Sequence, residues 1–503
     1  MDRRSVLMSG LAAAVVGSTL VMAGCNRQQA AAPKQKTTVN LGMVLEPPGL
    51  DPTAGAASAI GEITLYNVYE TLTKIGQDGS VQPLLAQSWQ ASADQKVWTF
   101  KLRTDAKFHN GEPFNAETVK FAFERAAAEG STNKDKTRFQ GLERIETPDA
   151  TTVVLHSRTP NPDLPFLLGL ATAVIVEPKS VATNATQPVG TGPFVFDNWQ
   201  KGAAVTLKKW EGYREASKIA MTQATFRFIS DAAAQAAALL SGDLDVFIRV
   251  QVARSLDQFR NDQRFNVQIG ASSAKTIVAL NNAKAPLNDV RVRQALAYAI
   301  DRSAVIAGAA DGLGVPIGSY YVPGMPGYID LTSVHAHNLD KARALLKEAG
   351  VQNLTLTMKL PPPPYARQGG EVIAAQLAKI GVTVRLENVE WAQWLSQVYG
   401  KSDYDMTMIS HVEPYDLGNF AKADYYWNYK SDKFNALYAR INATADAQER
   451  NALLGEAQKM VAEEAVGLYL YQPQWVTVHS KQLQGVWQHM PVFVNDLASM
   501  RWS

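Results

Sequence analysis

Short segments of this chain alternate apolar and polar residues, while others repeat apolar residues every three or four positions. Apolar residues at 39, 41 and 43, and again at 98, 100 and 102, occupy every second position. This spacing puts them on one face of an extended chain, so we expect a strand in each segment. Asn110 and Gly111 follow the second segment, and this dipeptide favours a tight turn.

Helices are predicted where a capping residue precedes apolar residues at helical spacing. Asn115 stands before apolar residues at 119, 122, 123 and 126, which share one helix face. Asp231 opens an alanine-rich segment that ends at Gly242. Asp289 opens another segment, whose apolar face runs from Val292 to Ile300. Each of the three segments therefore has a start signal and a buried face of a helix.

The segment 354–389 combines both patterns. Apolar residues at 354, 356, 358 and 360 predict a strand, which Pro361–Pro364 ends. A helical segment follows up to Gly381, and apolar residues at 382, 384 and 386 predict the next strand. A strand, a helix and a strand in this order form a crossover between two parallel strands. Because strand and helix signals alternate through most of the chain, we predict an α/β fold.

The N-terminal 25 residues have the layout of a removable secretory segment. Met1–Arg4 is basic, Val6–Met22 is apolar and small, and Cys25 is the only cysteine among 503 residues. Residues 21–25 resemble a bacterial lipobox with Met22 in place of leucine, and residues 2–7 resemble a twin-arginine export signal. We favour a lipidated Cys25 over a plain cleaved signal with an incidental thiol, because a lone exported thiol cannot form an internal disulfide. The polar segment 26–37 is predicted to be a tether.

Composition and motifs exclude several classes of function. The formal net charge is +2 and no polybasic block is present, so we expect no nucleic-acid partner. Phosphate-binding loops, dinucleotide fingerprints and nucleophile elbows are missing from the sequence. His335 and His337 form a His-x-His pair that would bind metal only with further ligands, and we favour surface polarity as its explanation. We therefore expect neither an enzyme nor a bound cofactor.

A set of motifs in order along the chain resembles the family 5 extracellular solute-binding proteins, the peptide- and nickel-type receptors of ATP-binding-cassette importers. The resemblance rests on segments spread over nearly all of the chain after the secretory segment: Leu50–Pro52, Tyr69–Leu72, Leu84–Trp89, Trp98–Arg103, Phe108–Phe114, Phe121–Arg125, Pro188–Phe194, Leu239–Asp245, Asp289–Leu296 and Lys341–Gly350. Single segments are weak signals, whereas the combination is specific.

The resemblance implies an α/β, two-lobed periplasmic-binding-protein-like fold with an extra subdomain and a ligand cleft between the lobes. Residues 1–25 would be the signal segment with the lipobox cysteine, followed by the tether 26–37. The remaining boundaries follow the family: lobe 1 would comprise 38–62, 180–270 and 475–503, the extra subdomain 63–179, and lobe 2 271–474. Lobes joined by a few crossing segments can rotate, and a ligand that touches both favours the closed state.

The same resemblance suggests three residues of a ligand site. Glu46 stands four residues before Leu50, as a cleft-facing glutamate does in oligopeptide receptors. Asn281 matches an asparagine that contacts the ligand backbone, and Trp391 matches a tryptophan at the pocket wall. We expect Trp394, by contrast, to be a core residue.

The chain departs from peptide-binding relatives after the predicted strand near Tyr404. Counting without gaps puts His411 where those relatives carry tryptophan, and Pro414 where they carry the aspartate that takes the peptide amino group. Glu413 is the nearest carboxylate, and it is either a replacement for that aspartate or a solvated loop acid. His411 could hydrogen-bond an anionic ligand, ligate a metal chelate, or be a structurally satisfied histidine, which we favour.

The remaining motifs are interpreted mainly as structural. We expect the turn at 108–114 to serve folding, because Gly111 permits its backbone geometry. The glycines of 190–193 allow a close backbone approach. Arg291 and Arg293 are predicted on a solvated helix face or paired with acids. The aromatic run 425–429 either covers the second lobe or lines the pocket, and we favour the first interpretation.

The sequence therefore predicts an extracytoplasmic receptor that captures a small peptide or peptide-like ligand for import. Its partners would be an inner-membrane permease with separate ATPase subunits, and its membrane attachment the lipid on Cys25. We expect a monomer in the periplasm or on the outer side of the membrane. A receptor for a metal chelate, haem, or a non-peptide solute such as an opine or sugar is the alternative, and an envelope hydrolase is a more distant one.

Overall fold

The protein is described from a computed structural model, in which residues 36–55, 57–250 and 256–503 are placed. Cys25, the secretory segment and most of the predicted tether lie outside these described residues. Within the described part, no helix is both long enough and apolar enough to span a bilayer.

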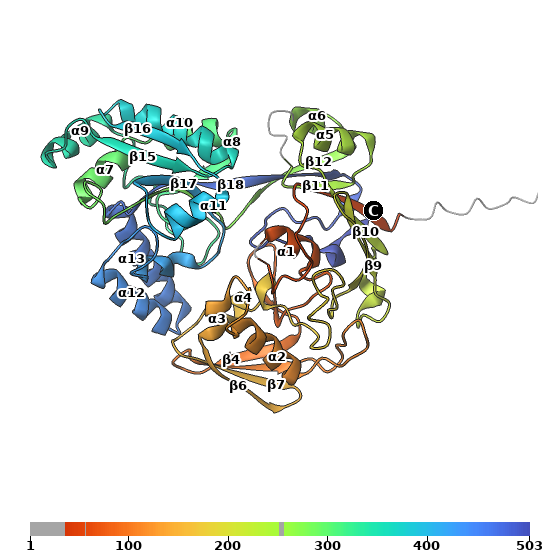
Figure 1. Cartoon of the computed structure of the whole chain (residues 1–503). Coiled ribbons are helices and arrows are strands. Elements are labelled where there is room, and N and C mark those ends of the chain that lie inside the picture. The colour runs from red at the N-terminus through yellow and green to blue at the C-terminus, as the bar shows by residue number, and fades with distance from the viewer. Residues whose placement is uncertain (1–35, 56, 251–255) are drawn as a thin grey trace, which may run out of the picture. The chain divides into compact units, whose positions relative to one another are not determined.

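A twelve-stranded sheet is the largest element of the described chain (Figure 1). Its main path runs in the order β16-β15-β17-β13-β18-β11-β1-β10-β9-β8, with β12 and β14 attached to β18. The strands are β1 (Thr38–Met43), β8 (Phe194–Gln200), β9 (Ala204–Lys209), β10 (Gln223–Phe228), β11 (Val246–Ile248), β12 (Phe265–Ala271), β13 (Lys275–Leu280), β14 (Gly314–Pro316), β15 (Thr355–Leu360), β16 (Thr383–Asn388), β17 (Met406–His411) and β18 (Gly467–Ser480).

Strand β18 joins the two halves of this sheet. Its first half pairs with β13 and β14, and its second half pairs with β11 and β12. Fourteen residues are unusually many for one strand, whose common length is about 5–6 residues. The long strand therefore runs from the half of the sheet that contains β13 into the half that contains β11.

Smaller sheets complete the strand content. The four-stranded sheet has the order β4-β5-β7-β6 and is fully antiparallel. Its strands are β4 (Ala86–Ala91), β5 (Val97–Leu102), β6 (Leu142–Asp149) and β7 (Thr152–Ser157). Two further pairs are β2 (Thr73–Ile75) with β3 (Val81–Pro83), and β19 (Leu483–Gln484) with β20 (Arg501–Trp502). The strands predicted from alternation are confirmed as β1 and β5.

Thirteen α-helices are described. They are α1 (Ser58–Thr64), α2 (Ala116–Ala127), α3 (Lys136–Gln140), α4 (Leu164–Leu167), α5 (Ala232–Ser241), α6 (Leu256–Arg260), α7 (Val290–Tyr298), α8 (Arg302–Ala310), α9 (Leu339–Glu348), α10 (Pro364–Ala378), α11 (Trp391–Gln393), α12 (Asp432–Ala443) and α13 (Ala447–Glu463). Short 3₁₀ segments lie at Ala171–Ala173, Ala216–Lys218, Asp416–Ala421 and Leu497–Ser499, and α11 continues as a π-helix, Trp394–Tyr399.

The predicted helix starts are confirmed by their hydrogen bonds. Asn115 forms a capping box with Thr118 at the start of α2. Asp231 accepts from the Ala234 amide at the start of α5, which ends at Gly242 in the left-handed conformation. The crossover at 354–389 is confirmed as β15-α10-β16, with Thr355 opposite Thr383 in a parallel pair.

Both faces of the sheet around β13 are covered. Val278 and Leu280 face a core with residues of α7, α8, α9 and α10, whereas Ile277 and Ala279 face a core with residues of α12 and α13. Alternate residues of a strand point to opposite faces, so every residue of β13 is buried. The aromatic run 425–429 joins the second core, with Tyr426, Trp427 and Tyr429 buried, which confirms that it covers this part of the chain.

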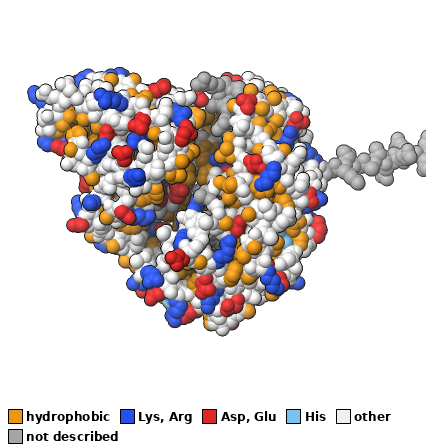
Figure 2. All heavy atoms as spheres, in the orientation of Figure 1, with side chains coloured by type: hydrophobic (Ala, Val, Ile, Leu, Met, Phe, Trp, Pro, Cys, Tyr) orange, Lys and Arg blue, Asp and Glu red, His pale blue; other side chains and the backbone are white. Residues whose placement is uncertain are grey.

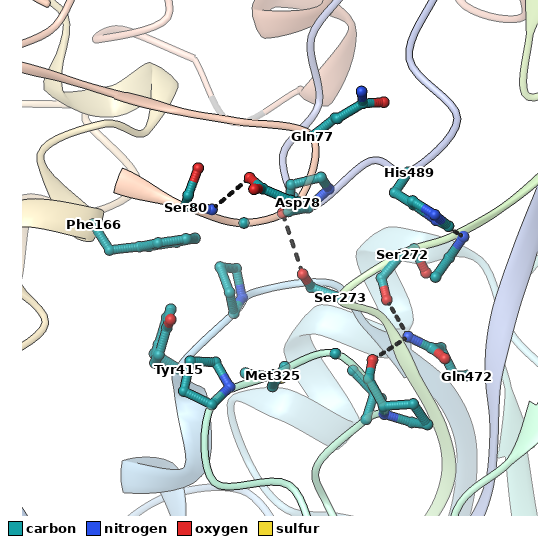
Figure 3. Close-up of a pocket in the computed structure, with 18 of the residues that line it drawn as sticks. Gln77, Asp78, Ser80, Phe166, Ser272, Ser273, Met325, Tyr415, Gln472 and His489 are labelled. Atoms are coloured by element: carbon teal, nitrogen blue, oxygen red, sulfur yellow. Dashed lines mark hydrogen bonds between the residues drawn. The ribbon is translucent and has the colours of Figure 1, made fainter. Parts of the chain in front are cut away.

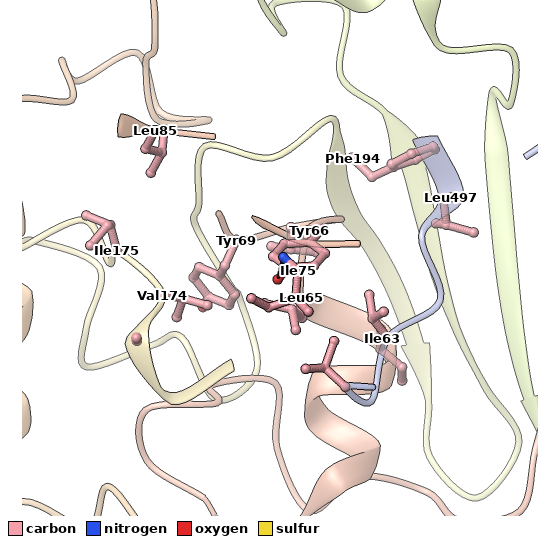
Figure 4. Packing of buried hydrophobic residues seen from close by; sticks show 14 of the residues in the cluster. Ile63, Leu65, Tyr66, Tyr69, Ile75, Leu85, Val174, Ile175, Phe194 and Leu497 are labelled. Carbon is pink, nitrogen blue, oxygen red and sulfur yellow. Dashed lines mark hydrogen bonds between the residues drawn. The ribbon is translucent and has the colours of Figure 1, made fainter. Parts of the chain in front are cut away.

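A separate large core joins β1 and the segments around α1 to the four-stranded sheet (Figure 4). Tyr66 and Tyr69 lie at its centre, and the Tyr66 hydroxyl donates to the Gly169 carbonyl at 2.7 Å. Nearby, Gly190 and Gly192 press against the backbone of Val68 and Asn67. A Cβ atom at either glycine would lie 2.0 or 2.2 Å from a carbonyl oxygen, so the predicted close backbone approach is confirmed.

Two interpretations of charged or polar residues were wrong. Arg293 is buried and donates to the carbonyl oxygens of Leu287, Glu464 and Ala465, instead of lying on a solvated face or pairing with an acid. It satisfies carbonyls left open where α13 ends. His335 is buried against the Tyr298 ring, so surface polarity describes only His337. Arg291 is confirmed as exposed and paired with Asp289.

Candidate functional site

Two neighbouring cavities lie among loops that come from distant parts of the chain. The larger has a volume of about 590 Å³ and is the one drawn in Figure 3. Its apolar wall includes Phe166, Met325 and Tyr415. Ser272, Ser273, Gln472 and His489 supply polar groups on other sides. A concave, largely apolar site with a few polar groups is typical of small-molecule binding.

Most polar groups of the larger cavity are engaged in hydrogen bonds with the protein. Gln472 donates from Nε2 to the carbonyl oxygens of Ser272 and Pro323, at 2.6 and 3.2 Å (Figure 3). The Ser273 hydroxyl donates to the Pro491 carbonyl at 3.2 Å, and His489 Nδ1 accepts from the Ala271 amide at 3.1 Å. These bonds fix the walls and leave mainly shape and apolar surface for recognition.

The smaller cavity, about 410 Å³, carries most of the charge, whereas Asp78 is the charged residue that lines the larger one. Five charged residues line it: Lys134, Asp135, Arg138, Arg249 and Glu413. Pro414 and Pro491 line both cavities, so the two lie side by side. Elsewhere, charges of both signs are mixed over the face shown in Figure 2.

Only part of this charge is neutralised within the protein. Arg138 pairs with Asp135 at 3.0 Å, and Arg249 pairs with Glu62, which lies outside the lining. Arg249 adopts a left-handed backbone with φ of 60°, a strained conformation that often marks functional sites. In the described chain, Lys134 and Glu413 have no ion-pair partner within 4.0 Å. One free cation and one free anion therefore share the cavity.

The surroundings of Glu413 favour its ionised form. Loss of water around its carboxyl group tends to raise the pKa of Glu413, but the positive charges of Lys134 and Lys275 contribute to holding the pKa below its usual range. Glu413 is thus a carboxylate near neutral pH, and such a group attracts an ammonium ion.

The structure places Glu413 on a cavity wall, but Glu46 and Asn281 are engaged elsewhere. Glu46 accepts from the Trp199 indole at 2.8 Å and from the Gly202 amide at 3.0 Å. Asn281 is buried, and its Nδ2 donates to the carbonyl oxygens of Ser402 and Tyr404. Neither residue lines the two cavities described above.

The other two predicted site residues, Trp391 and His411, each contact an aromatic residue of the second core. Trp391 is 44% exposed and its ring meets the ring of Trp394 edge-on at 5.8 Å. Trp394 is buried, as predicted, and its Nε1 donates to Thr407 at 2.9 Å. His411 is buried at the end of β17, with Nε2 2.8 Å from the Tyr426 hydroxyl. Burial lowers the pKa of His411, with Asp416 and Glu413 opposing that effect.

His411, Glu413 and Asp416 bring their ligand atoms within 4.8 Å of one another. Three such groups could hold a metal ion, as the metal-chelate alternative requires. A cation already fills this place, because the Lys275 ammonium lies 2.6 Å from Asp416 Oδ1. His411 also bonds to Tyr426, so two of the three groups, His411 and Asp416, are already engaged within the protein.

Lys134, Arg249 and the residues of the larger cavity were not predicted from the sequence. Lys134 precedes α3 in a polar segment without a distinguishing pattern. Arg249 directly follows the buried strand β11. A cation in this position was the one signal in the sequence that could have indicated a site residue. The residues meet only because segments more than 100 positions apart fold together.

Adjacent cavities with fixed walls, lined by loops from several segments and holding unneutralised charges, define a small-molecule binding protein. The chain belongs to the bacterial extracellular solute-binding proteins of family 5, whose middle-region model matches residues 80–420. Members of this family are binding proteins.

Curated relatives match over most of their length. The chain is 29% identical to the probable D,D-dipeptide-binding periplasmic protein DdpA of Escherichia coli K12, covering 91% of this chain and 92% of the relative. It is 28% identical to the dipeptide-binding protein of the same organism, over 90% of each chain. The di/tripeptide-binding protein 1 of Pseudomonas aeruginosa is 27% identical, over 95% and 96%.

Solved structures share the fold. The periplasmic binding protein AgaA from A. tumefaciens R10, solved with agropinic acid, superposes with a TM-score of 0.79 at 28% identity, covering 93% of this chain and 99% of that one. HbpA2 from Haemophilus parasuis gives a TM-score of 0.82 at 25% identity, over 93% and 100%. The predicted α/β, two-lobed periplasmic-binding-protein fold is therefore confirmed.

Proposed function

We propose that this protein is the receptor of an ATP-binding-cassette importer and that it captures a short peptide with free termini. The main support for this proposal is that Glu413 and Lys134, an anion and a cation without ion-pair partners in the described chain, line the same 410 Å³ cavity. A short peptide with free termini has an ammonium group at one end and a carboxylate at the other. Glu413 binds the ammonium group and Lys134 binds the carboxylate in this proposal. The names of the relatives, which bind dipeptides and tripeptides, support the same class of ligand.

The two charged residues come from different parts of the chain. Lys134 lies in the predicted extra subdomain and Glu413 in the predicted second lobe. A ligand that contacts both is bound best by the arrangement that brings them together, so binding favours closure by its differential affinity. The larger cavity, which adjoins at Pro414 and Pro491, receives ligand side chains against Phe166 and Tyr415.

The other sequence-derived site residues have separate roles in this proposal. Trp391 contacts ligand or the opposite part of the chain through its exposed ring. His411 and Asn281 hold the segments on either side of the site, and Glu46 fixes the loop at Gly202. Ligand leaves chemically unchanged, so the protein is not an enzyme.

We also propose that the protein is exported and anchored outside the cytoplasm. The N-terminal segment carries it across the membrane, by the twin-arginine route if the resemblance of residues 2–7 holds, and Cys25 receives the lipid. An anchored receptor stays near its permease, which raises its effective concentration there. Palmitate labelling in the native host should mark the wild-type protein and not Cys25→Ser. Labelling of neither would remove the lipid from the proposal and leave the binding function standing.

The ligand is tested by thermal stabilisation of the purified protein. We expect dipeptides and tripeptides to raise the melting temperature with concentration, as ligands that bind only the folded state do. Their N-acetylated and C-amidated forms should be weaker, because each loses one charge. Glu413→Gln should remove the preference for a free amino group, and Lys134→Gln the preference for a free carboxylate. Equal stabilisation by all three forms would contradict the proposed roles.

A second class of solute is tested in the same panel. AgaA was solved with agropinic acid, so this compound and other acidic opine-like solutes are included beside the peptides. Stabilisation by such a solute without any response to peptides would replace the peptide in the proposal. Native mass spectrometry of freshly purified protein would identify retained ligand directly, and unchanged ligand mass after release is expected of a receptor.

A further inference from the structure

Lys275 is a fully buried lysine directly beneath the loop that carries Glu413. It begins β13, and its side chain is 0% exposed. A buried ammonium group is costly unless it is paired and hydrogen-bonded, so lysine is rarely found there. The rest of β13 is apolar apart from Thr276, which makes a charge at this position exceptional within the strand.

The ammonium group of Lys275 is bonded to the loop after β17. It donates to the Glu413 carbonyl oxygen at 2.5 Å and to Asp416 Oδ1 at 2.6 Å. It also lies 4.9 Å from the centre of the Tyr320 ring, whose hydroxyl donates to the other oxygen of Asp416 at 2.8 Å. Charge-assisted hydrogen bonds of this kind are about twice as strong as neutral ones.

The register of the sheet explains why one side chain can reach both groups. Lys275 stands directly opposite His411 in the antiparallel pair of β13 and β17. Opposite residues project from the same face, so the loop that leaves β17 after His411 passes over Lys275. Residues 413 to 416 are therefore tied down at both ends by a single ammonium group.

The opposite side of this loop forms the walls of both cavities. Glu413 and Pro414 line the smaller cavity, while Pro414 and Tyr415 line the larger. Tyr415 has a left-handed backbone with φ of 58°, a strained conformation that persists only where surrounding contacts impose it. The bonds of Lys275 on either side of Tyr415 are such contacts, and the ring of Tyr415 packs on Phe166 at 4.6 Å.

We propose that Lys275 is a positioning residue for ligand recognition: its ammonium group fixes the 413–416 loop, so that Glu413 and Tyr415 are held in the cavity walls before ligand arrives. The inference that this loop belongs to a ligand site rests on the proposed function. The contacts between Lys275 and the loop do not depend on it. Preorganisation of this kind raises affinity because less loop entropy is lost on binding.

The first experiment measures the loop without any ligand. Hydrogen exchange by mass spectrometry is followed across 411–417 in the wild type, Lys275→Met, and Lys275→Met with Asp416→Asn. The double variant avoids leaving Asp416 as an unpaired buried acid. We expect faster exchange confined to this loop in both variants. Unchanged exchange in the folded double variant would overturn the inference.

Lys359→Met is the matched control for loss of a buried lysine. Lys359 lies on β15 of the same sheet, is 9% exposed, and bonds to Gln397 and Asp403 away from both cavities. Its loss should lower thermal stability without changing exchange at 411–417. Equal loop exchange in Lys359→Met and Lys275→Met would reduce Lys275 to a general structural role.

A second readout is the titration of Glu413 by carboxyl carbon NMR, assigned with Glu413→Gln. Six charged or titratable groups act on or adjoin Glu413: Lys134, Arg138, His411, Lys275, Asp416 and Tyr425. Removing the Lys275 charge should raise the pKa of Glu413, and Lys359→Met should leave it unchanged. An unchanged pKa in Lys275→Met would show that this ammonium group does not act on Glu413.

The third readout is affinity for L-alanyl-L-alanine by calorimetry. Loss of Lys275 should weaken binding about ten-fold or more, the effect of losing charge-assisted hydrogen bonds. Affinity within two-fold of wild type would contradict the positioning role. If the wild-type protein binds no peptide, the proposed function fails, whereas loop exchange and the Glu413 titration still decide the role of Lys275.

Discussion

Arg450 donates from Nη2 to Oδ2 of Asp163 at 2.6 Å, an ion pair between residues 287 positions apart. Asp163 precedes α4 in the predicted extra subdomain, and Arg450 lies on α13 in the predicted second lobe. The two side chains are 16% and 13% exposed. Burial raises the pKa of Asp163 although Arg450 opposes that effect, so the pair is held together at a desolvation cost.

Breaking this pair on one side should destabilise the protein more than removing both charges. Asp163→Leu leaves Arg450 as a buried, unpaired cation, and we expect a loss of about 3 kcal/mol in the free energy of unfolding. The double variant Asp163→Leu with Arg450→Met should recover most of that loss. Urea unfolding of the four proteins in the cycle measures it, with exposed Asp340→Ala as the control, expected within about 1 kcal/mol of wild type. Simple additivity would contradict the coupling.

Gly192→Ala should destabilise the protein because its Cβ atom would meet the Asn67 carbonyl oxygen at 2.2 Å. Overpacking of this kind costs about 1–3 kcal/mol. Gly130→Ala is the matched control, since no atom lies within 4 Å of its Cβ position. Thermal unfolding of both variants decides the matter, and equal melting temperatures would show that the backbone at Asn67 yields.

Stability should fall on acidification partly through His335. Burial, with Arg302 and Lys341 adding to it, lowers the pKa of His335 to about 4. The unfolded chain binds a proton near pH 6.5 that the folded chain does not, so this stabilisation is present above pH 6.5 and is lost as pH falls toward 4. His335→Gln should flatten the slope by up to about 1.4 kcal/mol per pH unit. Urea unfolding at several pH values measures the slope, and His337→Gln, at an exposed position, should leave it unchanged.

The two neighbouring tryptophans should behave in opposite ways. Trp394→Ala removes a side chain that is 5% exposed and should cost about 3–5 kcal/mol of stability. Trp391→Ala should leave stability within about 0.5 kcal/mol, as exposed positions do, but weaken ligand binding if its ring meets the ligand as proposed. Chemical unfolding and calorimetry with the same peptide separate the two effects. Unchanged affinity in Trp391→Ala would remove that residue from the site.

Local elements were predicted well because their signals lie within a few residues of one another. Asn115 caps α2 through a residue three positions away, and the strands β15 and β16 show their alternation without reference to any other segment. Arg293 was misjudged for the opposite reason. Its partners at the end of α13 are about 170 residues away, and nothing near Arg293 indicates them.

The site residues also differ in whether a local signal in the sequence indicates them. Glu413 was predicted because the segment after β17 could be compared with the pattern of peptide-binding relatives. Lys134 and Arg249 have no such local pattern. The domain boundaries, the lipid on Cys25 and the ligand contacts of Glu46, Asn281, Trp391 and His411 stay predictions. Each of them depends on contacts or chemistry outside the segment that suggested it.

Signals along the sequence were enough to predict the α/β character of the chain, its helix starts, the β15-α10-β16 crossover and its family. Only the folded structure shows that Lys134 and Glu413 share a cavity. It also shows that Lys275 is buried beneath the 413–416 loop. Backbone propensity, capping and alternation act over a few residues, so they can be read in order along a chain. The pairing and burial of a charge depend on which distant segments fold against it, and only the folded chain brings those together.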